Sequence, residues 1–137
     1  MKRTFNWIVG VVLFLGLGGC VAAYTLVDEA EAGCAISANS GSPRCGPGDC
    51  AVSRNSGSVY CSKHIGGGAA VSANSGSVLC GVGGCAVSLN SGSVMCSPVA
   101  GGSAMVSPNS GSVRCTDAVG NSVSCTSGSS SDCESGR

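Results

Sequence analysis

Cysteine is the residue type with the greatest chemical potential in this chain, with 11 among 137 residues. Such a content in a short chain is typical of a scaffold held by disulfides, although thiolates also bind metals and carry out redox chemistry. Cys45 and Cys50, like Cys80 and Cys85, are separated by four residues. Zinc sites more often combine gaps of roughly two to four residues with histidine. We therefore expect no metal site and no cofactor, and keep a cysteine-based metal-binding or redox protein as an alternative.

Hydrolytic chemistry has little support in the sequence. The single histidine, His64, lies in a glycine-rich connector and is interpreted as a solvated loop residue. No nucleophile motif surrounds any serine, and the sparse acidic residues show no paired spacing. Past Cys20 there are five basic and seven acidic residues and few aromatics, which disfavours nucleic-acid binding. We expect no catalytic residue and a protein that is not an enzyme.

A short repeat is the strongest pattern in the chain. The tetrapeptide Asn-Ser-Gly-Ser occurs five times, at alternating spacings of 16 and 19 residues, and a cysteine follows each asparagine by six positions. The asparagines are Asn39, Asn55, Asn74, Asn90 and Asn109, and the cysteines are Cys45, Cys61, Cys80, Cys96 and Cys115. Five positions before the asparagines stand Cys34, Cys50, Ala69, Cys85 and Ala104. A period of this length predicts a solenoid or an array of small units.

The spacing of the cysteines also predicts disulfides. The pairs that share one twelve-residue frame, and should close locally, are Cys34–Cys45, Cys50–Cys61 and Cys85–Cys96. Cys80 and Cys115 have no partner in their frame, because alanine replaces it. They bond to each other if the 35-residue double unit forms one coil, and otherwise remain available to Cys125 and Cys133, which can also pair together.

Within each unit, apolar and polar residues alternate on both sides of the Asn-Ser-Gly turn, which predicts strand, turn, strand. The fold class is therefore all-β. We favour a short parallel β-solenoid of about five repeats, and keep a stack of disulfide-closed β-hairpins as the alternative. Stacking would align the five asparagines into an amide ladder. It would also set one outward row of serines, namely Ser37, Ser53, Ser72, Ser88 and Ser107.

The N-terminal residues predict export. Lys2 and Arg3 precede an apolar run over residues 7–19, as in a secretory signal peptide. Uncharged residues continue to Val27, so residues 7–27 are also long enough for an uncleaved transmembrane helix. Cleavage after Ala23 or Ala32 is a third possibility. All three alternatives place residues 34–137 outside the cytoplasm.

Leu17-Gly18-Gly19-Cys20 resembles the lipobox of bacterial lipoprotein signal peptides. The resemblance covers residues 1–20 and implies lipidation at Cys20, with sorting to the bacterial outer membrane or cell surface because Val21 follows. The repeat region is similar only in general style to the disulfide-braced β-solenoids of insect antifreeze proteins. Their motif is not shared, so that similarity implies no role for any residue.

The expected organisation is a signal peptide over 1–20 or an anchor over 7–27, a linker over 21–33, a Cys-rich β-repeat domain over 34–125 and a flexible Gly/Ser-rich tail over 126–137. The expected function is that of a non-enzymatic structural or surface-interaction protein anchored in the cell envelope. A protein that binds ice or another ordered surface is the alternative. The expected partners are the membrane, through the lipid or the N-terminal helix, and a surface ligand or a second copy of the chain.

Overall fold

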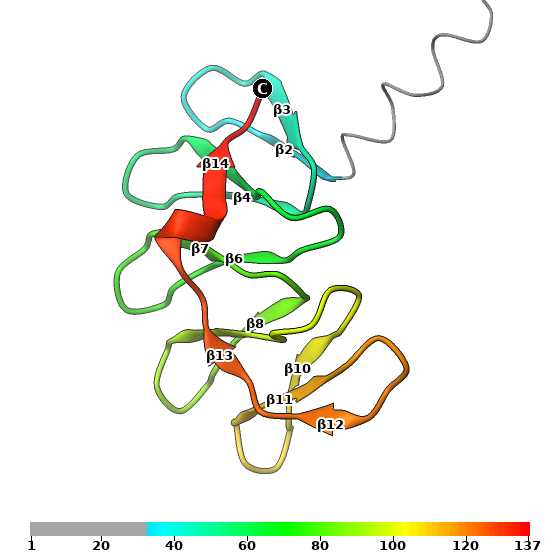
Figure 1. Ribbon diagram of the computed structural model, residues 1–137. Helices are drawn as coiled ribbons and strands as arrows, with labels where there is room; N and C mark the ends of the chain where they lie inside the picture. The colour runs from blue at the N-terminus through cyan, green and yellow to red at the C-terminus, as the bar shows by residue number, and fades with distance from the viewer. Residues whose placement is uncertain (1–32) are drawn as a thin grey trace, which may run out of the picture. The chain divides into compact units, whose positions relative to one another are not determined.

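The computed structural model describes residues 33–137, which form short β-strands and turns with one 3-10 turn, η1 (Ser130–Asp132). Five antiparallel hairpins follow one another along the chain and are numbered 1 to 5 here. They are β2 (Gly33–Ile36) with β3 (Pro43–Gly46), β4 (Cys50–Val52) with β5 (Val59–Ser62), β6 (Ala69–Val71) with β7 (Val78–Cys80), β8 (Cys85–Val87) with β9 (Val94–Cys96), and β10 (Ala104–Val106) with β11 (Val113–Thr116). The hairpins stack with their turns on one side and the connectors on the other (Figure 1).

The turn chemistry explains why each repeat folds back on itself. In hairpin 1 the N–H groups of Ser37 and Gly41 donate to the carbonyl oxygens of Ser42 and Ser37, each over 2.9 Å. Gly41 has a φ of 69°, in the left-handed region that glycine adopts at little cost. The Ser37 hydroxyl accepts the N–H groups of Asn39 and Ser40, at 3.2 and 3.4 Å. The reversal is therefore completed within six residues and needs no distant partner.

The all-β class agrees with the sequence prediction, but the preferred parallel solenoid does not. Every strand pair within residues 33–137 is antiparallel, and each hairpin pairs its own two strands. Cys50 lies directly opposite Cys61 with their Cα atoms 3.9 Å apart, as the alternative of stacked hairpins requires. The local turn makes antiparallel pairing available at short loop length, whereas a parallel coil would have to pair strands across successive units.

The core is a narrow column inside the stack. Its buried apolar residues come only from the second strand of the hairpins: Val59, Cys61, Val78, Cys80, Val94, Cys96 and Cys115. Seven small side chains bury little apolar area, so covalent links must supply a large share of the stability.

The C-terminal segment pairs with every hairpin in turn. This strap, residues 122–137, contains β12 (Ser122–Val123), β13 (Thr126–Ser127), η1 and β14 (Cys133–Ser135). β12 pairs with β11, β13 with β9 and β14 with β5, while Ser129 bridges to Cys80. Arg137 exchanges two 2.9 Å backbone hydrogen bonds with Cys45. Residues 126–137 were expected to be a flexible tail because of their Gly/Ser content. They are instead paired, because the outer edges of the second strands offer unsatisfied backbone groups.

The stack ends at hairpin 5 through two departures from the repeat. In hairpins 1 to 4 the residue before the asparagine donates its N–H to a glycine carbonyl of the next hairpin, as Ala73 does to Gly92 over 2.9 Å. In hairpin 5 that residue is Pro108, which has no N–H. The alanine in the middle of the first strand becomes Met105, whose side chain is 63% exposed. The end of the stack is therefore not shaped to accept a sixth hairpin.

Several predictions concern residues outside the described range. They are the signal peptide of residues 1–20, the lipobox with Cys20, the alternative anchor of residues 7–27 and the linker up to residue 32. Within residues 33–137 no helix is long and apolar enough to cross a membrane.

Candidate interaction surfaces

The cysteines of the described residues form five disulfides. Three close hairpins 1, 2 and 4 at the spacing the sequence predicts: Cys34–Cys45, Cys50–Cys61 and Cys85–Cys96. The other two are Cys80–Cys133 and Cys115–Cys125. Hairpins 3 and 5 thus use their second-strand cysteine to hold the strap, which explains why alanine stands opposite. Cys80 and Cys115 are not bonded to each other.

Every cysteine from residue 34 to residue 133 is disulfide-bonded, so the pairs with four-residue gaps do not form a thiolate site. Cys45 and Cys50 belong to different disulfides, as do Cys80 and Cys85. In residues 33–137 there is no group of three or more His, Cys, Asp or Glu residues placed to hold a metal ion. Five disulfides indicate an oxidising, extracytoplasmic environment.

The turns of the five hairpins form a continuous surface, here called the turn edge. Its central asparagines do not bond to one another as an amide ladder. Instead, the Nδ2 of Asn74 donates to the carbonyl oxygen of Ser91 in the next hairpin over 2.6 Å. The same bond recurs from Asn39 to Ser56, from Asn55 to Ser75 and from Asn90 to Ser110.

The glycine of each turn makes room for this asparagine. A Cβ atom on Gly57, Gly76, Gly92 or Gly111 would lie 2.5–2.7 Å from the Oδ1 of the preceding hairpin's asparagine. The first turn has no hairpin before it, and a Cβ on Gly41 would meet nothing within 4 Å. The motif therefore has two roles: the glycine permits the reversal, and it also permits close stacking.

The serine at the start of each turn is buried rather than outward. Ser37, Ser53, Ser72 and Ser88 are each less than a tenth exposed, which corrects the predicted outward row. The hydroxyl of Ser72 donates to the carbonyl oxygen of Gly92 over 3.3 Å and accepts two N–H groups of its own turn. Ser107, in the last hairpin, is half-buried. The burial follows from stacking, because these hydroxyls face the neighbouring turn.

A different set of serines is exposed on the turn edge. They follow the asparagines and are Ser40, Ser56, Ser75, Ser91 and Ser110. Each accepts the N–H of the serine two positions later, as Ser75 does from Ser77 over 3.3 Å. Their oxygen atoms are therefore held in one orientation, repeated once per hairpin.

Two hollows lie between the turn edge and the strap. The larger, about 490 Å³, is lined by Asn55 and Ser77 on one wall and by Ser130 and Glu134 on the other. The smaller, about 260 Å³, reaches Asn39 and Arg44. Tyr60 and Ser135 line both, so the two hollows adjoin; together they are called the strap groove. This groove was not predicted from the sequence, since it exists only where the strap lies beside the turns.

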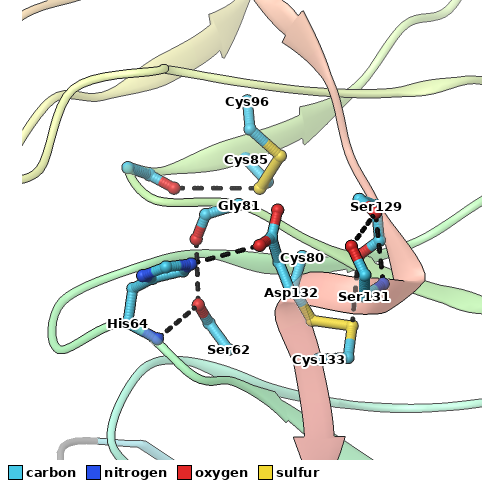
Figure 2. Close-up of polar contacts among 11 residues, drawn as sticks. Ser62, His64, Cys80, Gly81, Cys85, Cys96, Ser129, Ser131, Asp132 and Cys133 are labelled. Atoms are coloured by element: carbon cyan, nitrogen blue, oxygen red, sulfur yellow. Dashed lines mark hydrogen bonds and ion pairs between the residues drawn. A yellow bond between two sulfur atoms is a disulfide. The ribbon is translucent and has the colours of Figure 1, made fainter.

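His64 contacts the strap rather than lying free in its loop. Its Nε2 lies 3.2 Å from Oδ1 of Asp132, and both side chains are more than a third exposed. Ser62 is fully buried nearby, but its hydroxyl donates to the carbonyl oxygen of Gly81 over 2.9 Å and accepts the backbone N–H of His64 (Figure 2). Within residues 33–137 the His64 ring forms no hydrogen bond with this hydroxyl. The arrangement ties a connector to the strap and lacks the serine–imidazole bond of a hydrolase triad.

Asp117 organises the turn that leads into the strap. The backbone N–H of Asn121 donates to its Oδ1 over 2.8 Å, and this bond is the largest cause of the lowered pKa of Asp117. Burial opposes the shift, while the Asn121 side chain and the N–H groups of Val119 and Gly120 add to it. The ionised carboxylate therefore favours the folded turn.

Comparison with known protein families, with curated proteins and with solved structures finds no match to this chain.

Proposed function

We propose that the chain is a non-enzymatic structural or surface-interaction protein anchored in the cell envelope. The supporting observation is the bracing of a core-poor stack by the strap, which pairs with all five hairpins and is held by Cys80–Cys133 and Cys115–Cys125. Such a stack resists unfolding without a large apolar core, and each of its five hairpins presents the same polar turn. The anchor is the lipid on Cys20 or the N-terminal apolar helix.

The covalent contribution to this bracing is large. A disulfide that closes an 11-residue separation, as in three hairpins, contributes about 3 kcal/mol by the chain-entropy model. The 53-residue separation of Cys80–Cys133 contributes about 4 kcal/mol by the same model. These contributions suit a protein that must keep its shape outside the cell, where thiols stay oxidised.

A second candidate function, binding to ice or another ordered surface, is favoured by the exposed serine oxygens of the turn edge. These oxygens have one orientation and repeat once per hairpin, and such a regular array could match the repeating groups of a crystalline surface. Thermal hysteresis of the full chain tests this candidate, with a Ser56→Ala, Ser75→Ala and Ser91→Ala triple variant expected to lose it. A variant activity equal to that of the unchanged chain would exclude the turn edge as the binding surface.

A cysteine-based metal or redox role would require one of the five bridges to be reduced first. Metal analysis and thiol titration of the native protein test it. Bound metal, or free thiols beyond Cys20, would favour that role over the structural one.

The proposal itself is tested by cell fractionation and intact mass with and without reductant. We expect the protein in the membrane fraction, with an acyl mass on Cys20 or an uncleaved N-terminus, and five disulfides that each take up two hydrogen atoms on reduction. A Cys20→Ser variant is the matched control, since it removes acylation without touching the stack. A fully soluble, fully reduced protein would overturn the proposal.

A further inference from the structure

The strap groove has the size and shape of a ligand site. Its two hollows of about 490 and 260 Å³ adjoin at Tyr60, and ligand sites commonly measure roughly 300–1,000 Å³. One wall is the turn edge, which repeats along the stack, and the other is the strap, which runs the length of it (Figure 1). A groove between two such walls is suited to an extended ligand rather than to a compact one.

The free groups of the groove decide the chemistry of this ligand. The second strand β5 pairs with the strap on one side, as Ser135 with Tyr60, and with β4 on the other, so it has no free edge for an added peptide strand. Val59 and Val78 are buried, so the accessible apolar surface comes from other side chains of the lining. The amides of Asn39 and Asn55 are already bonded to the next turn, so the groups left for a ligand are serine hydroxyls and one aromatic ring.

The charged side chains of the strap groove further restrict the class of ligand. Arg44 is the one cation of the lining and Glu134 the one anion, and Glu134 accepts a 3.2 Å bond from Arg137. A strongly anionic polymer would need a row of cations, which this lining lacks. An uncharged ligand with many hydroxyl groups matches the balanced charge of the lining and can form hydrogen bonds with its polar side chains.

We propose that the strap groove binds an uncharged polysaccharide strand, with the Tyr60 ring packing against the apolar face of a sugar ring. Tyr60 is the only Phe, Trp or Tyr in residues 33–137, and it lines both hollows. A tyrosine supplies a large, rigid contact area at low entropy cost, and its hydroxyl stays available to a polar ligand. The hydroxyls of Ser130 and Ser135 fix the strand. This inference names a ligand for the surface-interaction role proposed above and depends on it.

The test is titration calorimetry of the oxidised full chain in detergent with N-acetylglucosamine oligomers and with linear glucose oligomers. A sulfated polysaccharide serves as the anionic comparison. We expect saturable binding of a neutral oligomer, a dissociation constant raised about tenfold or more by Tyr60→Ala, and a smaller loss in Tyr60→Phe. Met95→Ala is the matched control, because Met95 holds the same repeat position in hairpin 4 and does not line the groove.

Three results would overturn the inference: no saturable binding of either neutral oligomer, preference for the sulfated polymer, or equal binding by the Tyr60→Ala variant. Disulfide content by mass and circular dichroism show that each variant keeps the stack. Membrane fractionation of the unchanged chain separates failure of this inference from failure of the envelope proposal. An unchanged chain that is found in the membrane fraction but binds no neutral oligomer refutes the groove inference alone.

Discussion

The hydrogen bond between successive turns gives the sharpest test of the stacking. In an Asn74→Ala variant, hairpins 3 and 4 lose the 2.6 Å bond from Nδ2 to the carbonyl oxygen of Ser91. A bond of this kind contributes roughly 0.5–1.5 kcal/mol. Because Asn74 is exposed, water can replace part of it, so we expect a loss of about 1 kcal/mol in the free energy of unfolding. A loss of that size lowers Tm by roughly 4–8 °C in a domain of about this length.

Asn109→Ala is the matched control, because the repeat ends there. Asn109 begins the same Asn-Ser-Gly-Ser motif, after Pro108 instead of alanine, but no hairpin follows to accept its amide, and no side-chain bond of Asn109 is formed within residues 33–137. We expect its unfolding free energy to stay within about 0.5 kcal/mol of the unchanged chain. Thermal and denaturant unfolding of the oxidised protein, followed by circular dichroism, measures both variants. Equal losses in the two would refute the reasoning, since the effect would then come from the turn itself rather than from stacking.

Three further predictions concern the strap, the end of the stack and pH. Cys133→Ser should lower the free energy of unfolding by about 4 kcal/mol and leave Cys80 as a free thiol, measured by denaturant unfolding and thiol titration; an unchanged midpoint would show that the strap does not brace the stack. Replacing Met105 and Pro108 together by alanine should expose an end that stacks on a second copy, seen as concentration-dependent sedimentation; a variant that sediments as the unchanged chain does would refute the capping role. The folded-state pKa of Asp117 is lowered, so its stabilising contribution is present above the unfolded pKa and is lost as pH falls through the folded pKa; the protection factors of the amides in its turn, taken relative to the intrinsic exchange rate at each pH, should fall over that acid range, and Asp117→Asn should remove this fall.

The sequence predicted the class, the unit and the local disulfides, because each depends on residues close together in the chain. Cys34 and Cys45 lie in one frame around a turn, and a hairpin brings such residues opposite each other without help from distant parts. Local sequence does not distinguish a hairpin stack from a parallel solenoid, because both satisfy the same alternation of apolar and polar residues. The hydrogen bonds of the turns, such as those around Ser37 and Gly41, show that the units are hairpins.

The strap could not be predicted, because the composition of its residues is typical of a flexible tail. The groove could not be predicted either, because it is formed only where the strap lies beside the turns. Residues 126–137 are rich in glycine and serine, which is typical of a flexible tail. They are ordered by the backbone edges of five hairpins, which no local sequence pattern reveals. The position of Tyr60 in the strap groove was not predictable either, since it depends on Ser135 lying beside it, 75 positions later in the chain.

Irregularities in the repeat carried more information than the repeat itself. Ala69 and Ala104 stand where three other units have cysteine, and each leaves a cysteine on the opposite strand, Cys80 or Cys115, without a local partner. In the hairpin stack Cys80 and Cys115 are not bonded to each other, and their partners are Cys133 and Cys125, which follow the repeat. The two alanines therefore mark the hairpins to which the strap is bonded. Pro108 likewise marks the end of the stack, because a proline at this position removes the backbone N–H that each earlier turn donates to the next unit.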